Sequence, residues 1–264
     1  MTTPTRAAAL ADLDSAVIPD WMAAQIVADA AAGRFARWGR STVVDEGAGA
    51  PVLSRELFDE LHEIAGLHGA DIAWPVGNAG LLHVYGYLLS TAETPFGRKR
   101  DRWVDGGVAR AFGLPADAFA PWFETPSAAD STPLERILAL AEPFVADPAD
   151  GDFTVLWIDE TGESGADATD PDANAAAGEA IASVITLART VVISDDDSGA
   201  TALLYAVGPV DAPLLVTLFP LQGFDAGWLE RAVAGQPRLR YNAVDERNVA
   251  SAPLVDREVM LRNF

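Results

Sequence analysis

Apolar positions recur at helical intervals over much of the first half of the chain. The clearest case is Ser54–Ala65, where one apolar stripe follows a serine that can cap the helix and precedes Gly66, which can end it. Pro19 stands where a first helical turn tolerates proline. The spacing predicts helices over residues 4–38, with a break near Val17–Pro19, and over Ser54–Ala65, Val104–Phe112 and Pro133–Ala146.

Short runs of β-branched and apolar residues, separated by turn residues, dominate the second half. Asp195–Gly199 has the composition of a turn, and Gly208, Pro209 and Pro213 mark the next connection. Such runs with short connections predict an antiparallel meander. The predicted strands are Phe153–Ile158, Val191–Ser194, Ala202–Val207, Leu214–Phe219 and Arg238–Val244, with helices over Ile181–Ala188 and Asp225–Val233.

A polar stretch separates the two patterns. Asp159–Ala177 has no large apolar residue, so it cannot bury a core face and is predicted to be a flexible acidic loop or linker. The order of elements predicts an α+β fold, mainly helical in the first half, with an antiparallel sheet and a packed helix in the second. The expected units are residues 1–158, a linker over 159–179, and residues 180–264, which either form a separate domain or join the first.

The formal net charge of −21 narrows the range of partners. At a sequence pI near 4.3, the summed field repels nucleic acid backbones and anionic lipid head groups, so we expect no nucleic acid and no membrane partner. A large acidic excess also serves solubility alone. Asp12 and Asp14 interrupt the apolar residues near the N-terminus, which argues against a signal peptide and favours a soluble cytoplasmic protein.

Several kinds of site are excluded by residues that are missing. The 264-residue chain has no cysteine, so disulfides, thiolate nucleophiles, iron–sulfur ligation and cysteine zinc sites are excluded. Gly77–Gly80 lacks the spacing of a dinucleotide-binding loop, and no P-loop sequence occurs. Asp170–Asn174 and Asp195–Asp197 match calcium-binding loops only in part, and a linker and a turn explain them. We therefore predict no metal site.

One stretch, residues 81–103, reverses the acidic character of the chain, since it is basic and aromatic. Two conformations fit its beginning. As a strand it would place His83, Tyr85 and Tyr87 on one face, whereas as a helix it would present an apolar stripe behind a capping Asn78. The periodicity leaves both interpretations open.

The arginines that follow this stretch suggest an anion site. If the segment is extended and a turn over Thr91–Gly97 pairs it with the first strand, the arginines share one face and line one pocket together with the aromatic residues. Arginine binds carboxylate or phosphate bidentately, and tyrosine adds apolar area with a hydroxyl group. In the structural alternative, the arginines neutralise surface carboxylates and the aromatic residues belong to the core. The predicted site residues are His83 and Lys99 as catalytic groups, with Tyr85, Tyr87, Arg98, Arg100 and Arg102 as substrate-binding groups.

Lys99 is the only lysine in the chain, so any Schiff-base chemistry, including attachment of pyridoxal phosphate, must use it. The flanking Arg98 and Arg100 would favour its neutral, nucleophilic amine by repelling a positive charge. A composition that prefers arginine to lysine would also explain why the chain has only one lysine. The sequence identifies no cofactor.

Two hypotheses about function follow. In the first, the protein is an enzyme that acts on a small anionic substrate resembling a carboxylate or an amino acid, and a deaminase or lyase is its most specific form. In the second, it is a non-catalytic, immunity-type or regulatory protein whose acidic surface docks a basic partner. Convergence of the histidine, tyrosines and arginines on an enclosed pocket would favour the enzyme.

Overall fold

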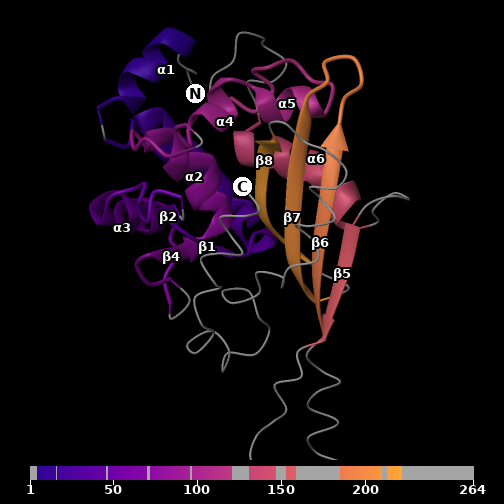
Figure 1. The fold of residues 1–264 in the computed structure, drawn as a ribbon. Coiled ribbons are helices and arrows are strands. Elements are labelled where there is room, and N and C mark those ends of the chain that lie inside the picture. Colours follow the sequence, from indigo (N-terminus) through magenta and orange to yellow (C-terminus); the bar gives the residue numbers. More distant parts are fainter. Residues whose placement is uncertain are drawn as a thin grey trace, which may run out of the picture.

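The computed structural model describes an α+β fold (Figure 1). The described residues are 5–15, 17–45, 47–69, 72–95, 97–120, 131–146, 153–158, 185–209 and 213–221. Helices dominate up to residue 146, and the main antiparallel sheet follows. The predicted fold class is therefore confirmed. The predicted linker Asp159–Ala177, helix Asp225–Val233 and strand Arg238–Val244 lie outside the described residues.

The helices agree closely with the apolar spacing. They are α1 (Arg6–Leu13), α2 (Asp20–Ala31), the 3₁₀ helix η1 (Arg34–Arg37), α3 (Arg55–Ile64), the π-helix η2 (Leu81–Tyr85), the 3₁₀ helix η3 (Gly86–Leu89), α4 (Asp101–Val104), α5 (Gly107–Ala111) and α6 (Pro133–Ala146). Ser54 caps α3 as predicted, since its hydroxyl accepts a 3.2 Å hydrogen bond from the Leu57 amide. The helix predicted over Val104–Phe112 is instead divided, because Gly106 takes a left-handed conformation with φ of 68° between α4 and α5.

The main sheet consists of four antiparallel strands in the order β5-β6-β7-β8. Their bounds are Phe153–Ile158 for β5, Ile185–Ser194 for β6, Thr201–Pro209 for β7 and Leu214–Leu221 for β8. The predicted meander is confirmed for β6, β7 and β8. Two small antiparallel pairs lie in the helical half, and they join β1 (Arg40–Thr42) to β4 (Val76–Asn78) and β2 (Val44–Asp45) to β3 (Ala50–Pro51).

The acidic run between β6 and β7 forms the predicted turn. The Asp195 carboxylate accepts a 2.8 Å hydrogen bond from the Ser198 amide, and Gly199 has a left-handed φ of 67°. The Ser198 hydroxyl also lies 3.4 Å from the Arg110 carbonyl oxygen, which places the turn against α5. Turn geometry thus accounts for this cluster of aspartates.

The predicted helix over Ile181–Ala188 is wrong where the structure describes it. Residues from Ile185 onward belong to β6, and Ile185 pairs with Ile158 at the end of β5. A short apolar run fits a buried strand as well as a helix, and here the hydrogen bonds to β5 and β7 decide in favour of the strand.

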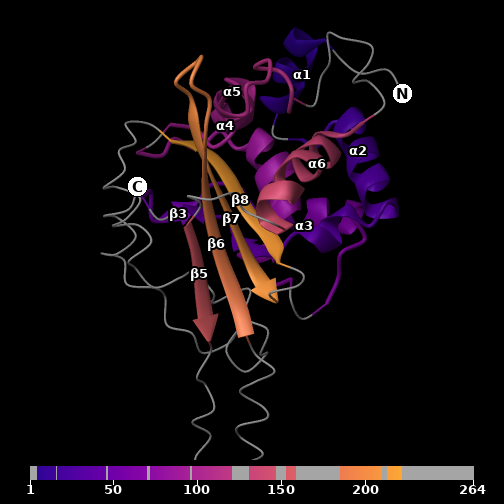
Figure 2. The same ribbon diagram turned by 90° about the vertical axis from the view of Figure 1, so that its right-hand side faces the viewer.

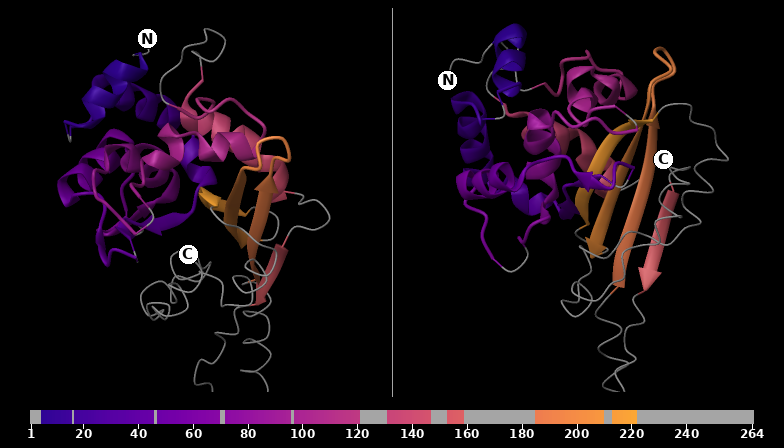
Figure 3. Two further views of the ribbon diagram at one scale, coloured as in Figure 1. Left: turned by 45° about the horizontal axis from the view of Figure 1, so that its top comes forward. Right: turned by 60° about the vertical axis from the view of Figure 1, so that its left-hand side comes forward.

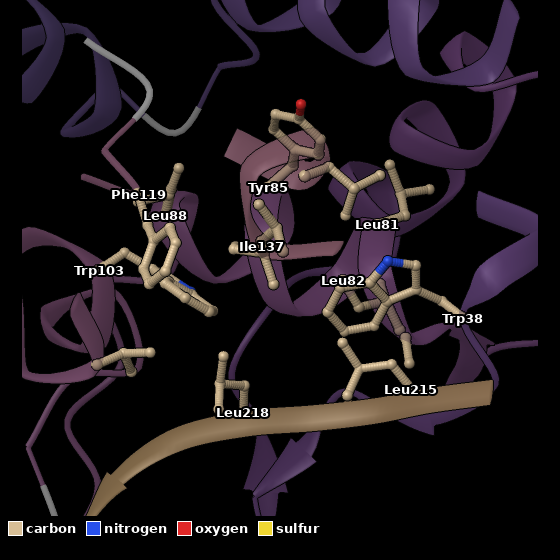
Figure 4. Close-up of a cluster of buried hydrophobic side chains, with 14 of the residues drawn as sticks. Trp38, Leu81, Leu82, Tyr85, Leu88, Trp103, Phe119, Ile137, Leu215 and Leu218 are labelled. Atoms are coloured by element: carbon tan, nitrogen blue, oxygen red, sulfur yellow. The ribbon is translucent and has the colours of Figure 1, made fainter. Parts of the chain in front are cut away.

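The helices gather on one face of the sheet (Figure 2, Figure 3). Figure 4 shows Leu215 and Leu218 pointing from β8 into a buried cluster that includes Trp38, Leu82 and Ile137. All five side chains are at most 3% exposed. Burial of large apolar side chains contributes about 1.5–3 kcal/mol each, so this layer between helices and sheet is the main source of stability.

The edge strand β8 is joined to the helical half by main-chain bonds as well as by packing. The Gly39 amide donates a 2.9 Å hydrogen bond to the Leu215 carbonyl, and Trp38 forms a parallel bridge with Leu215. The Gly39 carbonyl accepts a 2.8 Å bond from the Ala79 amide just before η2. Residues 38–39 therefore fix the start of η2 relative to the sheet.

Candidate functional site

The basic and aromatic stretch begins with a π-helix. The Asn78 side chain accepts a 3.1 Å hydrogen bond from the Leu81 amide, as the helical interpretation expected, and every residue from 79 to 90 is buried. The strand interpretation is wrong, because the backbone satisfies its hydrogen bonds within η2 and η3. π-Helices are rare and occur frequently at functional sites.

The helical geometry pairs His83 with Tyr87 instead of aligning three alternate residues. Their rings stack with centroids 4.8 Å apart and planes inclined by 23°. The His83 Nε2 atom lies 3.0 Å from the Ser41 hydroxyl oxygen on β1, and the His83 carbonyl accepts a 2.7 Å bond from the Trp103 indole. The imidazole is therefore held by Tyr87 on its face and by Ser41 at its edge.

Lys99 and Arg102, from the second part of the basic and aromatic stretch, both lie near the ring of Tyr87. The Lys99 Nζ lies 5.9 Å from the Tyr87 ring centroid, and the Arg102 guanidinium carbon lies 5.5 Å from it. The Arg102 group is also 5.4 Å from the ring of Phe219 on β8, so it lies against two aromatic rings. We call His83, Tyr87, Lys99 and Arg102 the basic-aromatic cluster.

The charge of this cluster is only partly compensated. Lys99 forms an ion pair with the buried Asp45 carboxylate at the end of β2. Burial alone would raise the pKa of Asp45, but the hydrogen bond and charge of Lys99, together with the Ala48 amide and the charge of Arg102, outweigh it and lower that pKa. Arg102 interacts with Asp45 through charge alone, since it forms no ion pair and no hydrogen bond with the described part of the chain. The cluster therefore keeps one uncompensated positive charge.

Burial and charge shift two further groups. Burial lowers the pKa of His83 well below its usual value of 6.5, and the positive charges of Arg102 and Lys99 lower it further. Burial also lowers the pKa of the Arg102 guanidinium. His83 is therefore neutral at pH 7 and carries a lone pair that can accept a proton.

The structure places three predicted site residues elsewhere. The Arg98 guanidinium pairs with Glu93 at 2.6 Å on the surface, and that of Arg100, whose side chain is 12% exposed, pairs with Asp14 at 2.6 Å. Both guanidinium groups are thus turned towards carboxylates. The cause is local, because residues 98–104 form a turn leading into α4 and not an extended strand.

Tyr85, the third displaced residue, belongs to a buried polar network on the other side of η2. Its hydroxyl donates a 2.5 Å hydrogen bond to Oδ2 of Asp29, which is fully buried on α2. The Thr132 hydroxyl donates a 2.5 Å bond to Oδ1, and Arg34 pairs with the same oxygen at 3.0 Å. The network ties α2, η2 and the start of α6 together, and no sequence motif indicated it.

Electrostatics in this network is dominated by burial. Burial raises the pKa of Asp29, and the hydrogen bonds from Thr132, Tyr85 and Arg34 offset only part of that rise. Arg136 lies nearby, and burial lowers its pKa to about 10. Its guanidinium donates to the carbonyl oxygens of Ala118, Ala120 and Ser131. These hydrogen bonds join separate segments of the chain, so the role of the network is to stabilise the fold.

His62 is a second buried histidine with a structural role. Its Nδ1 lies 2.8 Å from the Phe58 carbonyl, so Nδ1 donates, and its Nε2 accepts a 3.2 Å bond from the Asn78 amide. Asn78 in turn caps η2. A neutral His62 therefore links α3 to the beginning of the π-helix.

The His62 link predicts acid sensitivity. Burial lowers the pKa of His62 from 6.5, so its contribution to stability is complete above pH 6.5 and is lost as the pH falls from that value through the lower pKa of the folded state. The free energy of unfolding should decrease from pH 7.5 to pH 5, and the decrease should be smaller in His62→Gln. Urea denaturation at several pH values measures both slopes. His68→Gln, at an exposed position, should retain the wild-type slope; equal slopes in wild type and His62→Gln would contradict the assignment.

Other kinds of site find little support. Among the residues that the structure describes, no group of three or more histidine, aspartate or glutamate side chains is placed to hold a metal ion. No helix in the described ranges is long and apolar enough to cross a membrane. Comparison with family models, curated proteins and solved structures finds no match. The basic-aromatic cluster is thus the candidate that the structure itself supports.

Proposed function

We propose that the chain is an enzyme that binds a small anionic substrate at the basic-aromatic cluster. The carrying observation is Arg102, a guanidinium held against the rings of Tyr87 and Phe219 that forms no ion pair and no hydrogen bond with the described part of the chain and shares the charge of Asp45 with Lys99. In a chain with a net charge of −21, carboxylates are abundant. Near this cluster, however, Lys99 and Arg102 share the one carboxylate of Asp45, which leaves one positive charge for an anion from outside.

The partners of Arg102 favour a compact anion with an apolar or unsaturated body. Arginine offers a planar fork of donors that suits carboxylate and phosphate, while Tyr87 provides an aromatic face. Lys99 adds a second charge at the same ring, but Asp45 balances it. The net charge of the group therefore suits a monoanionic carboxylate better than a highly charged phosphate.

His83 provides the chemistry in this proposal. It is buried, neutral at pH 7 and stacked on the same tyrosine ring that Lys99 and Arg102 approach. A neutral imidazole beside a bound anion can remove a proton from a substrate or from a hydroxyl group. Lys99 acts here as a charged group, because its pairing with Asp45 stabilises the ammonium form.

Anion binding is expected to stabilise the wild-type protein and to depend on Arg102. A ligand at one hundred times its dissociation constant adds about 2.7 kcal/mol to the free energy of unfolding, which corresponds to a rise in Tm of roughly 5–10 °C for a chain of this size. Thermal unfolding with acetate, succinate, amino acids and phosphate measures this rise. Arg102→Met, which keeps much of the apolar stem, should weaken the effect at least about 10-fold in concentration.

Arg98→Met is the matched control, because Arg98 lies on the surface and pairs with Glu93. It should keep the wild-type response. A response that persists unchanged in Arg102→Met would contradict the assignment of the site. A flat response to every anion would favour the alternative of an acidic protein that docks a basic partner.

A further inference from the structure

The Ser41 hydroxyl group is in contact with the candidate base. Its oxygen lies 3.0 Å from His83 Nε2, within hydrogen-bond distance. Ser41 is a partly exposed residue, whereas His83 is only 4% exposed, so the pair lies where the surface meets the core. The pair is brought together by the fold, since 42 positions separate the two residues in the chain.

The backbone of Ser41 is fixed on both sides. Ser41 is the middle residue of β1 and pairs with Gly77 of β4. A Cβ atom at Gly77 would lie 2.4 Å from His62 Nε2, so β4 rests directly against the buried histidine of α3. The strand that carries Ser41 is therefore held against α3, while η2 carries His83.

The histidine is also held in the orientation that a base needs. Its ring stacks on Tyr87, which leaves Nε2 directed to the serine. For Nε2 to accept the serine proton, Nδ1 must carry the ring hydrogen. Nδ1 is buried and makes no hydrogen bond with the described residues, but the Val216 backbone of β8 lies close enough to favour a charged ring.

We propose that Ser41 is a nucleophile activated by His83, and that the substrates are esters of small acids with a free carboxylate. The serine oxygen attacks the ester carbonyl while its proton passes to His83 Nε2. The carbon–oxygen bond to the alcohol then breaks, and the alcohol leaves with that proton. Water hydrolyses the acyl-serine in the same way, which releases the acid and restores Ser41.

The positive charges near the pair suit this reaction. Arg102 and Lys99 are close enough to His83 to act on it electrostatically. Charges of this kind can hold the free carboxylate of the substrate and stabilise the oxyanion that forms during attack. The carboxylate preference rests on the proposed anion site, whereas the reactivity of Ser41 rests on its own contact with His83.

Acylation by two esters tests the proposal. The full-length protein is mixed with 4-nitrophenyl acetate or with mono-4-nitrophenyl succinate, and both the burst of nitrophenolate and the mass of the protein are measured. We expect one acyl group per chain, located on Ser41 by peptide mapping, and a faster reaction with the succinate ester. Ser41→Ala should slow the burst at least about 10-fold. Ser15→Ala, at an exposed serine on a different surface loop, should not.

Two further variants separate this inference from the anion site. Arg102→Met should slow the reaction with the succinate ester at least about 10-fold more than it slows the reaction with the acetate ester. His83→Gln should slow both reactions, and Ser41→Ala keeps the test valid if His83→Gln fails to fold. Acylation that persists in Ser41→Ala, or that maps to Lys99, overturns the proposal even where anions still stabilise the protein. Acylation of Ser41 without a preference for the succinate ester overturns only the anion site.

The pH dependence gives an independent readout. His83 is faced by Ser41 of β1, Tyr87 of η3, Lys99 and Arg102 at α4, and the Val216 backbone of β8. Because burial and the two cations lower its pKa, the rate of Ser41 acylation should stay constant from about pH 8 down to about pH 6.5 and fall only in more acidic solution. A rate that rises steadily between those two values would contradict His83 as the base.

Discussion

Replacing Asp29 with alanine is expected to lower the free energy of unfolding by about 3–5 kcal/mol. Asp29 is fully buried, and its two carboxylate oxygens accept hydrogen bonds from Tyr85, Thr132 and Arg34. The substitution would leave two buried hydroxyl groups without their acceptor. Each unsatisfied group costs about 1–3 kcal/mol, and the loss of the Arg34 partner adds to that cost.

Urea denaturation of Asp29→Ala measures this effect. Asp196→Ala is the matched control, because Asp196 is exposed in the turn between β6 and β7 and its loss should change stability by no more than about 0.5 kcal/mol. A similar small change in Asp29→Ala would show that the network contributes little. Because the network lies on the opposite side of η2 from His83, we expect the residual folded protein to keep its anion response.

Gly80→Ala is expected to destabilise the fold by about 2–3 kcal/mol, although helix propensity alone would favour alanine by about 1 kcal/mol. Gly80 has ordinary helical torsion angles, with φ of −64° and ψ of −45°, so its backbone accepts a side chain. The added Cβ, however, would lie 2.5 Å from Cγ of Trp38, which is 3% exposed and closely packed. Steric overlap therefore outweighs propensity.

Two comparisons isolate this overlap. Gly86→Ala lies in the next helical segment, where the nearest atoms are methyl groups of Leu53 and Leu61 at 3.3 and 3.4 Å, and it should stay within about 1 kcal/mol of the wild type. In a Trp38→Leu background, Gly80→Ala should cost less than about 1 kcal/mol, because the indole is gone. An equal cost in both backgrounds would rule out the contact with Trp38 as its cause.

Local signals sufficed for much of the helical half. The cap at Ser54, the stripe over α3 and the proline at the start of α6 act through neighbours within a few residues, and the structure confirms them. The extension of β6 back to Ile185 depends instead on a partner strand, so the sequence around it could not distinguish helix from strand. The pairs of β1 with β4 and of β2 with β3 are too short to produce a pattern.

In the candidate site, too, the residues close in sequence could be predicted, and those from distant segments could not. His83 with Tyr87, and Lys99 with Arg102, are close in sequence, so a search for basic and aromatic residues finds them. Ser41, Asp45, Asp29 and Phe219 come from distant segments, and single polar or aromatic residues there have no local signature. Arg98, Arg100 and Tyr85 lie apart from the basic-aromatic cluster because the observed helices and turn send alternate residues to different sides, whereas the extended alternative would have aligned them.

The hydrogen bond from Gly39 to Leu215 has a consequence for how the chain acquires its structure during synthesis. The sheet edge that receives residues 38–39 is made roughly 175 residues later, which takes on the order of 10–35 s at ordinary translation rates. Until β8 leaves the ribosome, the apolar side of η2 and the Trp38 indole have no strand to cover them. Nascent chains that stop before residue 215 should therefore bind chaperones and be cut readily by proteases, whereas chains in which β8 has left the ribosome should resist, so the candidate site is completed only when β8 joins the helices.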